Sequence, residues 1–323
     1  MKWLGNAGWV ALVTATLGYA AAALAAERID ATSSEYKSHH IKSLEDKGRS
    51  TLSKRWKEAK LQASLPGGFA HTAPNILEGA DRLGRAFDVL TRSGRALKVV
   101  QLGDSHVAAG TYPAAVRTTL EKAWGSAAGD SISAPLRFNY LARNGATAEG
   151  FITPERAEQI AEMAPDLIIV SFGTNECHGM GYDPQAHRRQ LEIVYDRLRQ
   201  ACPEAVIMLT TPPGDYLSRT TTQPVRRGAR TQRRRVSVRG ANPMTAKCAE
   251  VIRTFGSEKG LAVWDLNAIA GGDSSASNWV AARLMRPDRI HFTPEGYRLH
   301  GCLLGEAILS AYNSYLTATT AQN

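Results

Sequence analysis

The chain has 323 residues, of which 43% are hydrophobic and 21% charged, and a formal net charge of +9. Without the N-terminal segment described next, about 300 residues remain, which are enough for one large domain or two small ones. Beyond the first 25 residues no apolar stretch approaches the roughly 20 residues that span a bilayer, which excludes a polytopic membrane protein.

The N-terminal segment has the pattern of a secretory signal peptide over residues 1–25. Lys2 is its only charged residue, and an alanine-rich apolar run ends in small residues at Ala23 and Ala25. We expect cleavage after Ala25 or Ala26, and the alternative is a retained N-terminal anchor, because the segment begins with little positive charge. No cysteine lies near the cleavage site, so a lipoprotein anchor is excluded. The expected product is soluble, periplasmic or secreted, with no stable membrane anchor.

Residues 26–75 form a polar leader that is poor in large apolar side chains. Its one candidate element is a short helix over Leu52–Leu65, and Pro66-Gly67-Gly68 ends the polar stretch. We expect this leader to be flexible or to lie across the surface. The globular domain is predicted to cover residues 76–323.

Apolar runs of strand length alternate with amphipathic helical segments through the rest of the chain. Strands are predicted at Leu97–Leu102, Phe138–Leu141, Asp166–Phe172, Ala205–Thr211 and Leu261–Asp265, and helices at Pro113–Trp124, Pro154–Met163, Pro184–Cys202, Met244–Lys259 and Pro294–Leu316. This alternation predicts an α/β fold, a three-layer α/β/α sandwich with a central parallel sheet. Ligands of such sheets bind at the carboxyl ends of the strands, so the residues that follow the strands are the candidates for chemistry.

An arginine-rich loop is predicted at residues 216–240, with eight arginines and no acidic residue. Loss of Lys2 with the signal peptide leaves a net charge of +8, so these arginines account for the whole excess. The loop is either a solvated, mobile insertion or a surface beside the active site in which Arg233, Arg234 and Arg235 grip an anionic polymer or a membrane. Nucleic acid is a disfavoured partner, because no aromatic residues interleave the arginines and an exported protein rarely meets it.

Four cysteines, Cys177, Cys202, Cys248 and Cys302, permit two disulfides in an oxidising compartment. Cys202 precedes its strand and is expected at the end of the sheet opposite the site. A Cys248–Cys302 or a Cys177–Cys248 bridge is therefore easier than any bridge to Cys202. None of the four has the spacing of zinc ligands.

The segment Gly103-Asp104-Ser105 follows the first predicted strand and precedes a predicted helix. A serine at such a turn has its hydroxyl lifted off the sheet edge and its N–H at the positive end of a helix, as a nucleophile that attacks a carbonyl requires. Turns favour the same residue types, so this segment alone is weak evidence.

Three further segments supply candidate partners. Asp288 stands three residues before His291, just ahead of a helix start, and can orient the imidazole from the same loop. Asn175 follows a very apolar strand and can donate a side-chain N–H to an oxyanion, and the backbone N–H of Gly145 can approach a substrate because no Cβ obstructs it. Capping, packing and turn formation are the alternative roles of the same residues.

Together these four blocks resemble the SGNH (GDSL-type) serine hydrolase family, over roughly Leu97 to Tyr315. The resemblance implies a flavodoxin-like fold, Ser105 as nucleophile, His291 as base and Asp288 as its orienting acid. It also implies an oxyanion hole made by the Ser105 N–H, the Gly145 N–H and the Asn175 side chain. No metal or other cofactor is implied.

The forms of the individual blocks look closest to periplasmic polysaccharide and peptidoglycan O-acetylesterases. These forms are the Ser105-His106 pair, Gly173-Thr174-Asn175-Glu176 and Met285-Arg286-Pro287-Asp288. The motif gives His106 no role, and a structural one is expected.

The resemblance therefore implies an exported serine esterase that removes O-acetyl groups from a cell-envelope or secreted polysaccharide. A polysaccharide O-acetyltransferase with the same triad is the first alternative, a lipase or thioesterase the second, and a non-catalytic glycan-binding module the third. The expected partner is an acetylated polysaccharide or peptidoglycan, and the oligomeric state stays open.

Overall fold

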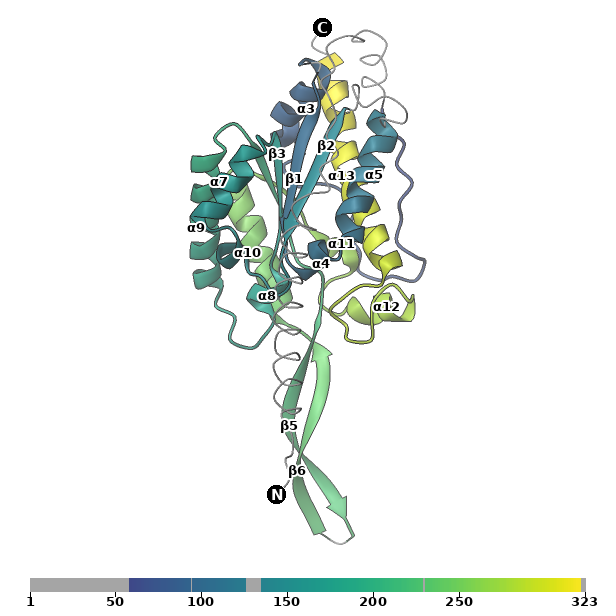
Figure 1. Ribbon diagram of the computed structural model, residues 1–323. Helices are drawn as coiled ribbons and strands as arrows, with labels where there is room; N and C mark the ends of the chain where they lie inside the picture. The colour runs from purple at the N-terminus through teal and green to yellow at the C-terminus, as the bar shows by residue number, and fades with distance from the viewer. Residues whose placement is uncertain (1–57, 94, 126–134, 229, 321–323) are drawn as a thin grey trace, which may run out of the picture.

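The core of the computed structural model is a parallel sheet of five strands (Figure 1) in the order β2-β1-β3-β4-β7. The structure describes residues 58–93, 95–125, 135–228 and 230–320, so the predicted signal peptide and residues 26–57 of the leader lie outside the described residues. The strands are β1 (Leu97–Gly103), β2 (Leu136–Ala142), β3 (Leu167–Ser171), β4 (Val206–Thr210) and β7 (Ala262–Trp264). This order is the flavodoxin-like one, and all five predicted strands are confirmed within two residues at either end.

The strands are apolar on both faces because both faces are covered. In β3, for example, Leu167 and Ile169 belong to one buried cluster, while Ile168 and Val170 belong to the other. Alternate side chains of a strand point to opposite faces, so a continuous apolar run supplies two cores at once.

Helices cover the two faces of the sheet (Figure 1), which confirms the three-layer α/β/α architecture. One layer contains η1 (Ala80–Leu83), α3 (Gly84–Thr91), α5 (Thr111–Trp124), α11 (Leu266–Ala270), α12 (Ala276–Ala281) and α13 (Pro294–Thr320). The other contains α6 (Ala148–Phe151), α7 (Pro154–Glu162), α9 (Pro184–Ala201) and α10 (Met244–Glu258). Two single-turn helices, α4 (Ser105–Ala108) and α8 (Thr174–Cys177), follow β1 and β3 directly. None of the described helices has the length and apolar character needed to cross a membrane.

The register of the sheet aligns the ends of its central strands. Gly103 of β1 pairs with Ala142 of β2 and Ser171 of β3, and Ser171 pairs with Thr210 of β4. The residues that follow these strands therefore leave the sheet at one edge, as the sequence predicts.

Residues 59–63 of the leader, here called the strap, lie across α13 in a non-helical conformation. The Ala59 N–H donates to the Asn313 side chain over 2.7 Å, and the backbone N–H groups of Gln62 and Ala63 donate to the Glu306 carboxylate over 2.7 and 2.8 Å. The predicted helix over Leu52–Leu65 is wrong for its described part, since residues 58–65 are not helical. The backbone N–H groups that would bond to carbonyls within a helix donate instead to side chains of α13.

The arginine-rich segment is a β-hairpin, so the prediction of a loop is wrong. Its strands, β5 (Tyr216–Arg227) and β6 (Arg230–Ala241), pair antiparallel along their whole length and project from the body of the domain (Figure 1). The reason lies in runs such as Thr220-Thr221-Thr222 and Val236-Ser237-Val238, whose β-branched residues favour extended backbone. Gly228, with φ +62°, lies at the turn.

All four cysteines are free thiols. Neither of the two bridges expected from the sequence, Cys248–Cys302 or Cys177–Cys248, is formed. For the first, Cys248 packs in the cluster on the α9–α10 side, whereas Cys302 lies on α13, which covers the other face. The sheet separates them. Cys177 and Cys248 lie on the same side, with their thiols directed at Thr245 and the Gly173 carbonyl.

The contact of α13 with α5 depends on a missing side chain at Gly301. A Cβ at this position would lie 2.4 Å from the Tyr112 carbonyl oxygen and 2.5 Å from the Ala115 Cβ. We therefore expect Gly301→Ala to lower the free energy of unfolding by about 1–3 kcal/mol, since overpacking forces the helices apart. Denaturant unfolding measures this change. The control is Gly84→Ala in α3, where a Cβ meets nothing within 4 Å; an equal loss in both variants would contradict the packing argument.

Candidate active site

The turn from β1 into α4 carries Ser105. Asp104 has extended backbone geometry and caps α4, because its Oδ1 accepts the His106 N–H over 2.9 Å. Ser105 is then the first residue of the helix, where the backbone N–H has no partner within the helix. The hydroxyl and an unpaired N–H therefore leave the sheet together at its carboxyl edge.

Ser105, His291 and Asp288 form a hydrogen-bonded chain across 186 residues of sequence. The Ser105 Oγ lies 3.1 Å from the His291 Nε2, and the His291 Nδ1 lies 3.1 Å from the Asp288 Oδ2. Since an ionised carboxylate only accepts, Nδ1 is the protonated nitrogen, and Nε2 is left to accept the serine proton. This is the arrangement that activates a serine.

The loop from Asp288 to His291 fixes the acid as well as the base. The Asp288 Oδ1 accepts the backbone N–H groups of Ile290 and His291 over 2.9 and 3.0 Å. Burial raises the pKa of Asp288, but these two bonds and the His291 side chain outweigh burial and hold the pKa below its ordinary value. The acid therefore stays ionised while it orients the imidazole. Both side chains are partly exposed, His291 by 34% and Asp288 by 40%, so the site opens to solvent.

The candidate oxyanion donors come from the ends of three neighbouring strands, β2, β1 and β3. Gly145 follows β2 with φ +71°, a conformation that side chains disfavour. Because glycine has no Cβ, nothing of its own side chain obstructs the approach to its N–H. Asn175 lies in α8, directly after β3, and its Nδ2 donates one hydrogen to the Ala146 carbonyl over 2.8 Å. An amide nitrogen carries two hydrogens, so the second is left for a substrate oxygen.

Glu176 is a residue that the sequence interpretation left without a role. Its two carboxylate oxygens accept the Ala148 N–H over 2.6 Å and the Gly173 N–H over 2.9 Å. It thus ties the Gly145 turn to the Asn175 turn. Burial raises the pKa of Glu176 to about 7, against the lowering effect of these bonds. The signal in the sequence was an acid next to Asn175, just after a buried strand.

Asp104 and His106 are buried on either side of Ser105 in the sequence. Burial raises the pKa of Asp104 to about 7 and lowers the pKa of His106 to about 3, so His106 is neutral. The His106 Nδ1 lies 3.2 Å from the Tyr297 hydroxyl, and the ring packs 5.7 Å from that of His291. His106 therefore packs against the His291 ring, and the structure describes no bond between His106 and Ser105.

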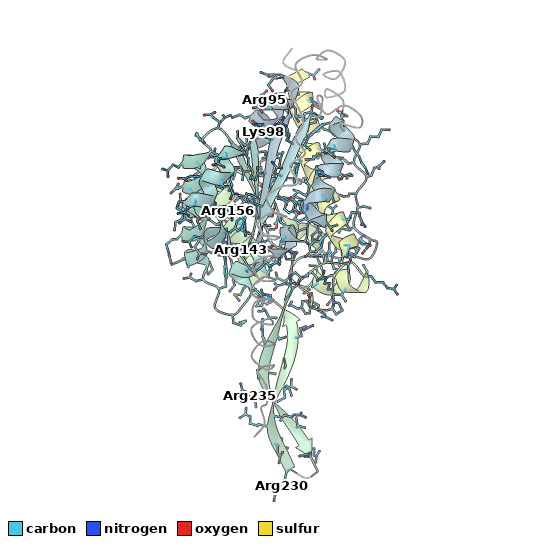
Figure 2. The ribbon with its side chains drawn as sticks, viewed as in Figure 1. Arg95, Lys98, Arg143, Arg156, Arg230 and Arg235 are labelled. Atoms are coloured by element: carbon cyan, nitrogen blue, oxygen red, sulfur yellow. The ribbon has the colours of Figure 1, made fainter. Side chains whose placement is uncertain are left out.

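The structure places Arg233, Arg234 and Arg235 away from this site, along the outer part of the hairpin (Figure 2, where Arg235 is labelled). Within the described residues, the base of the hairpin bonds to the loop that carries Asp288 and His291: the Tyr216 N–H donates to the Arg289 carbonyl over 3.0 Å, and the Arg239 guanidinium donates to the Pro287 carbonyl over 2.9 Å. The arginines expected beside the serine are thus linked to it through the loop that carries Asp288.

No group of three or more His, Cys, Asp or Glu side chains within the described ranges is arranged to hold a metal ion. The site consists of a serine, a histidine, an acid and N–H donors.

Comparison with known proteins identifies a family. The model of the GDSL-like lipase/acylhydrolase family matches residues 102–299, which span Ser105, Gly145, Asn175, Asp288 and His291. No curated protein matches the chain in sequence.

Several solved structures are similar to this chain. A peptidoglycan O-acetylesterase superposes with a TM-score of 0.58 at 14% identity, over 76% of this chain and 100% of that one. A lipase/acylhydrolase from Enterococcus faecalis matches with a TM-score of 0.43 at 17% identity, over 66% and 96% of the two chains. A GDSL-like lipase from Bacteroides thetaiotaomicron matches with a TM-score of 0.41 at 17% identity, over 72% and 100%. At 14% identity the likeness to the peptidoglycan O-acetylesterase shows the fold alone.

Removing the nucleophile or the base tests the triad. We expect Ser105→Ala and His291→Ala each to lower kcat for an aryl acetate by about a thousandfold or more, because they act as one unit. Asp288→Asn should cost less than Ser105→Ala, since Asp288 orients the base and makes no bond to the substrate. Steady-state kinetics measure the loss, and thermal unfolding serves as the control for folding. A variant at Ser105 or His291 that kept a tenth of the activity would overturn the assignment.

The role of Asn175 in the oxyanion hole has a distinct kinetic signature. We expect Asn175→Ala to lower kcat by about 10²–10³-fold with little change in KM, because its hydrogen bond strengthens only as charge develops on the oxygen. The same aryl acetate serves as substrate. If KM rose while kcat stayed the same, Asn175 would be a ground-state binding residue.

Proposed function

This chain belongs to the GDSL-like lipase/acylhydrolase family, and from that premise we propose that it is an exported esterase that removes O-acetyl groups from a cell-envelope or secreted polysaccharide. The observation that carries the proposal is the Ser105–His291–Asp288 chain of hydrogen bonds at the open carboxyl edge of the sheet. Acyl transfer to a serine needs these three groups and an oxyanion hole beside them.

The first half-reaction forms an acyl-enzyme. The Ser105 Oγ attacks the carbonyl carbon of the ester while the His291 Nε2 takes the hydroxyl proton. The Ser105 N–H, the Gly145 N–H and the Asn175 amide donate to the oxyanion, and each such donor is worth about 3–4 kcal/mol of the barrier. His291 then gives its proton to the leaving sugar oxygen.

The second half-reaction releases the acid. His291 now takes a proton from water, the water oxygen attacks the acetyl carbon, and the Ser105 Oγ leaves with the proton that returns from His291. Asp288 stays ionised throughout, in line with its lowered pKa, and stabilises the imidazolium in both halves.

Two features support a polymer as the substrate. The His291 and Asp288 side chains are 34% and 40% exposed, so a long chain can pass over the site without entering a deep cavity. The fold match to a peptidoglycan O-acetylesterase supports an acetylated glycan in general terms. Export is part of the proposal and rests on the signal-peptide pattern of residues 1–25.

Acyl-chain length and acetyl balance test this function. We expect kcat/KM for p-nitrophenyl esters to fall from acetate to butyrate to octanoate, and acetate released from an acetylated glycan to equal the acetyl lost from it. The purified protein and its Ser105→Ala variant are compared, and a serine-directed phosphonate should label Ser105 alone.

Other outcomes identify the rivals. Acetyl groups recovered on an added acceptor glycan, instead of in acetate, would mean an O-acetyltransferase. Rates that rise with chain length would mean a lipase or thioesterase. Absence of phosphonate labelling and of turnover on every ester would leave a glycan-binding module.

A further inference from the structure

The hairpin formed by β5 and β6, here called the arginine arm (residues 216–241), is built as a cationic rod. Its strands are 12 residues each, which at about 3.3 Å per residue gives a ribbon roughly 40 Å long. Its base lies at the catalytic edge and its far end, near Arg230, projects beyond the rest of the described domain (Figure 2). The length of the ribbon greatly exceeds what a link from β4 to α10 requires.

All eight arginine side chains of the arm are exposed. In the part of the chain that the structure describes, none of them forms an ion pair with a carboxylate. The sequence of the arm holds no acidic residue at all. Eight uncompensated cations on one narrow ribbon create a strong positive field that calls for an anionic ligand.

The two faces of the arm carry equal charge. From the register and the alternation of side chains, one face presents Arg226, Arg233, Arg235 and Arg239, and the other presents Arg219, Arg227, Arg230 and Arg234. A membrane is flat and would engage one face only. Cations on both faces suit a flexible chain that follows or wraps the ribbon.

The remaining side chains also favour a glycan over a lipid surface. Between the arginines lie hydroxyl and amide groups, such as Thr222, Gln223 and Ser237, which can bond sugar hydroxyls. The segment 217–240 contains no aromatic residue, whereas membrane-binding elements insert Trp, Phe or Leu. Arginine pairs with carboxylate and phosphate through two parallel hydrogen bonds, so both anions fit this surface.

The base of the arm is fixed to the catalytic loop. Besides the bonds from Tyr216 and Arg239 to that loop, the Arg289 guanidinium lies 4.6 Å from the centre of the Tyr216 ring. The buried Asp215 carboxylate accepts from the Asn242 side chain over 2.9 Å and from Thr245 over 2.6 Å. These contacts hold the arm in a defined direction from the catalytic edge.

We propose that the arginine arm binds an anionic stretch of the polysaccharide and so delivers its acetyl ester to Ser105. This inference rests on the proposed function and narrows its substrate to a glycan that carries carboxylate or phosphate groups. The arm acts on binding of the polymer and takes no part in bond making, so its contribution appears in KM and disappears for a small neutral ester.

The test compares two triple variants of the full protein. In the arm variant, Arg233, Arg234 and Arg235 become Ser; in the control variant, the exposed residues Arg85, Arg92 and Arg189 of the helical layers become Ser, with the same change in net charge. On acetylated polygalacturonate at low salt, we expect the arm variant to show KM raised by about tenfold with kcat unchanged, and the control variant to match the wild type. The difference should shrink with added salt, because the Debye length falls to about 8 Å at physiological ionic strength. With p-nitrophenyl acetate all three proteins should be equal.

Direct binding separates this inference from the proposed function. Binding of unacetylated polygalacturonate and of poly(glycerol phosphate) to the Ser105→Ala protein needs no turnover. We expect the arm substitutions, added to Ser105→Ala, to weaken the binding of at least one of these two polymers. Neutral xylan should bind neither the Ser105→Ala protein nor its arm variant. The two polymers decide between carboxylate and phosphate as the recognised group. Equal binding by arm and control variants would overturn the proposal even if the esterase is active. Tighter binding to anionic lipid vesicles or to duplex DNA than to either polymer would overturn it as well.

Discussion

Parallel pairing of β1 with β2 and β3 is the constraint on which the catalytic site depends. Because Gly103 is in register with Ala142 and Ser171, the chain leaves all three strands at the same level of the sheet. Turns that are separated by up to 70 residues in sequence therefore become neighbours, and each can supply one N–H donor to the same point. The loop of His291 needs only to reach that edge, which it does at the start of α13.

Two carboxylates hold these turns in place, the buried Asp104 and the partly buried Glu176, and removing a carboxylate from water is costly. Asp104 accepts a backbone N–H at the start of α4, and Glu176 accepts one N–H from each of the turns that carry Gly145 and Asn175. These bonds repay part of the desolvation, yet burial still raises the pKa of each acid to about 7. Both carboxylates accept hydrogen bonds from backbone N–H groups of these turns. Their value lies in fixing N–H donors, which must be positioned before charge develops on the ester oxygen.

The sequence alone determined the elements of the domain and the types of residue at its edge. Apolar runs such as Leu167–Ser171 can be buried on both faces only in a parallel sheet covered by helices, so the alternation of strands and helices specified the three layers. The spacing of Ser105, Gly145, Asn175 and His291 along the chain was enough to recognise the family. Local pattern suffices here because strand and helix periodicity are local properties.

Only the tertiary structure decided contacts that have no local signature. That Glu176 bonds two turns, that Cys248 and Cys302 lie on opposite faces, and that α13 and the strap share their hydrogen bonds follow from which faces meet across the sheet. The arginine arm is the clearest case. Its composition reads as a solvated loop, but cross-strand pairing turns β-branched residues into a ribbon, and its direction comes from the bonds that Tyr216 and Arg239 make to the catalytic loop. The sequence alone gives the charge of the arm, whereas non-local hydrogen bonds set the direction in which the arm extends from the domain.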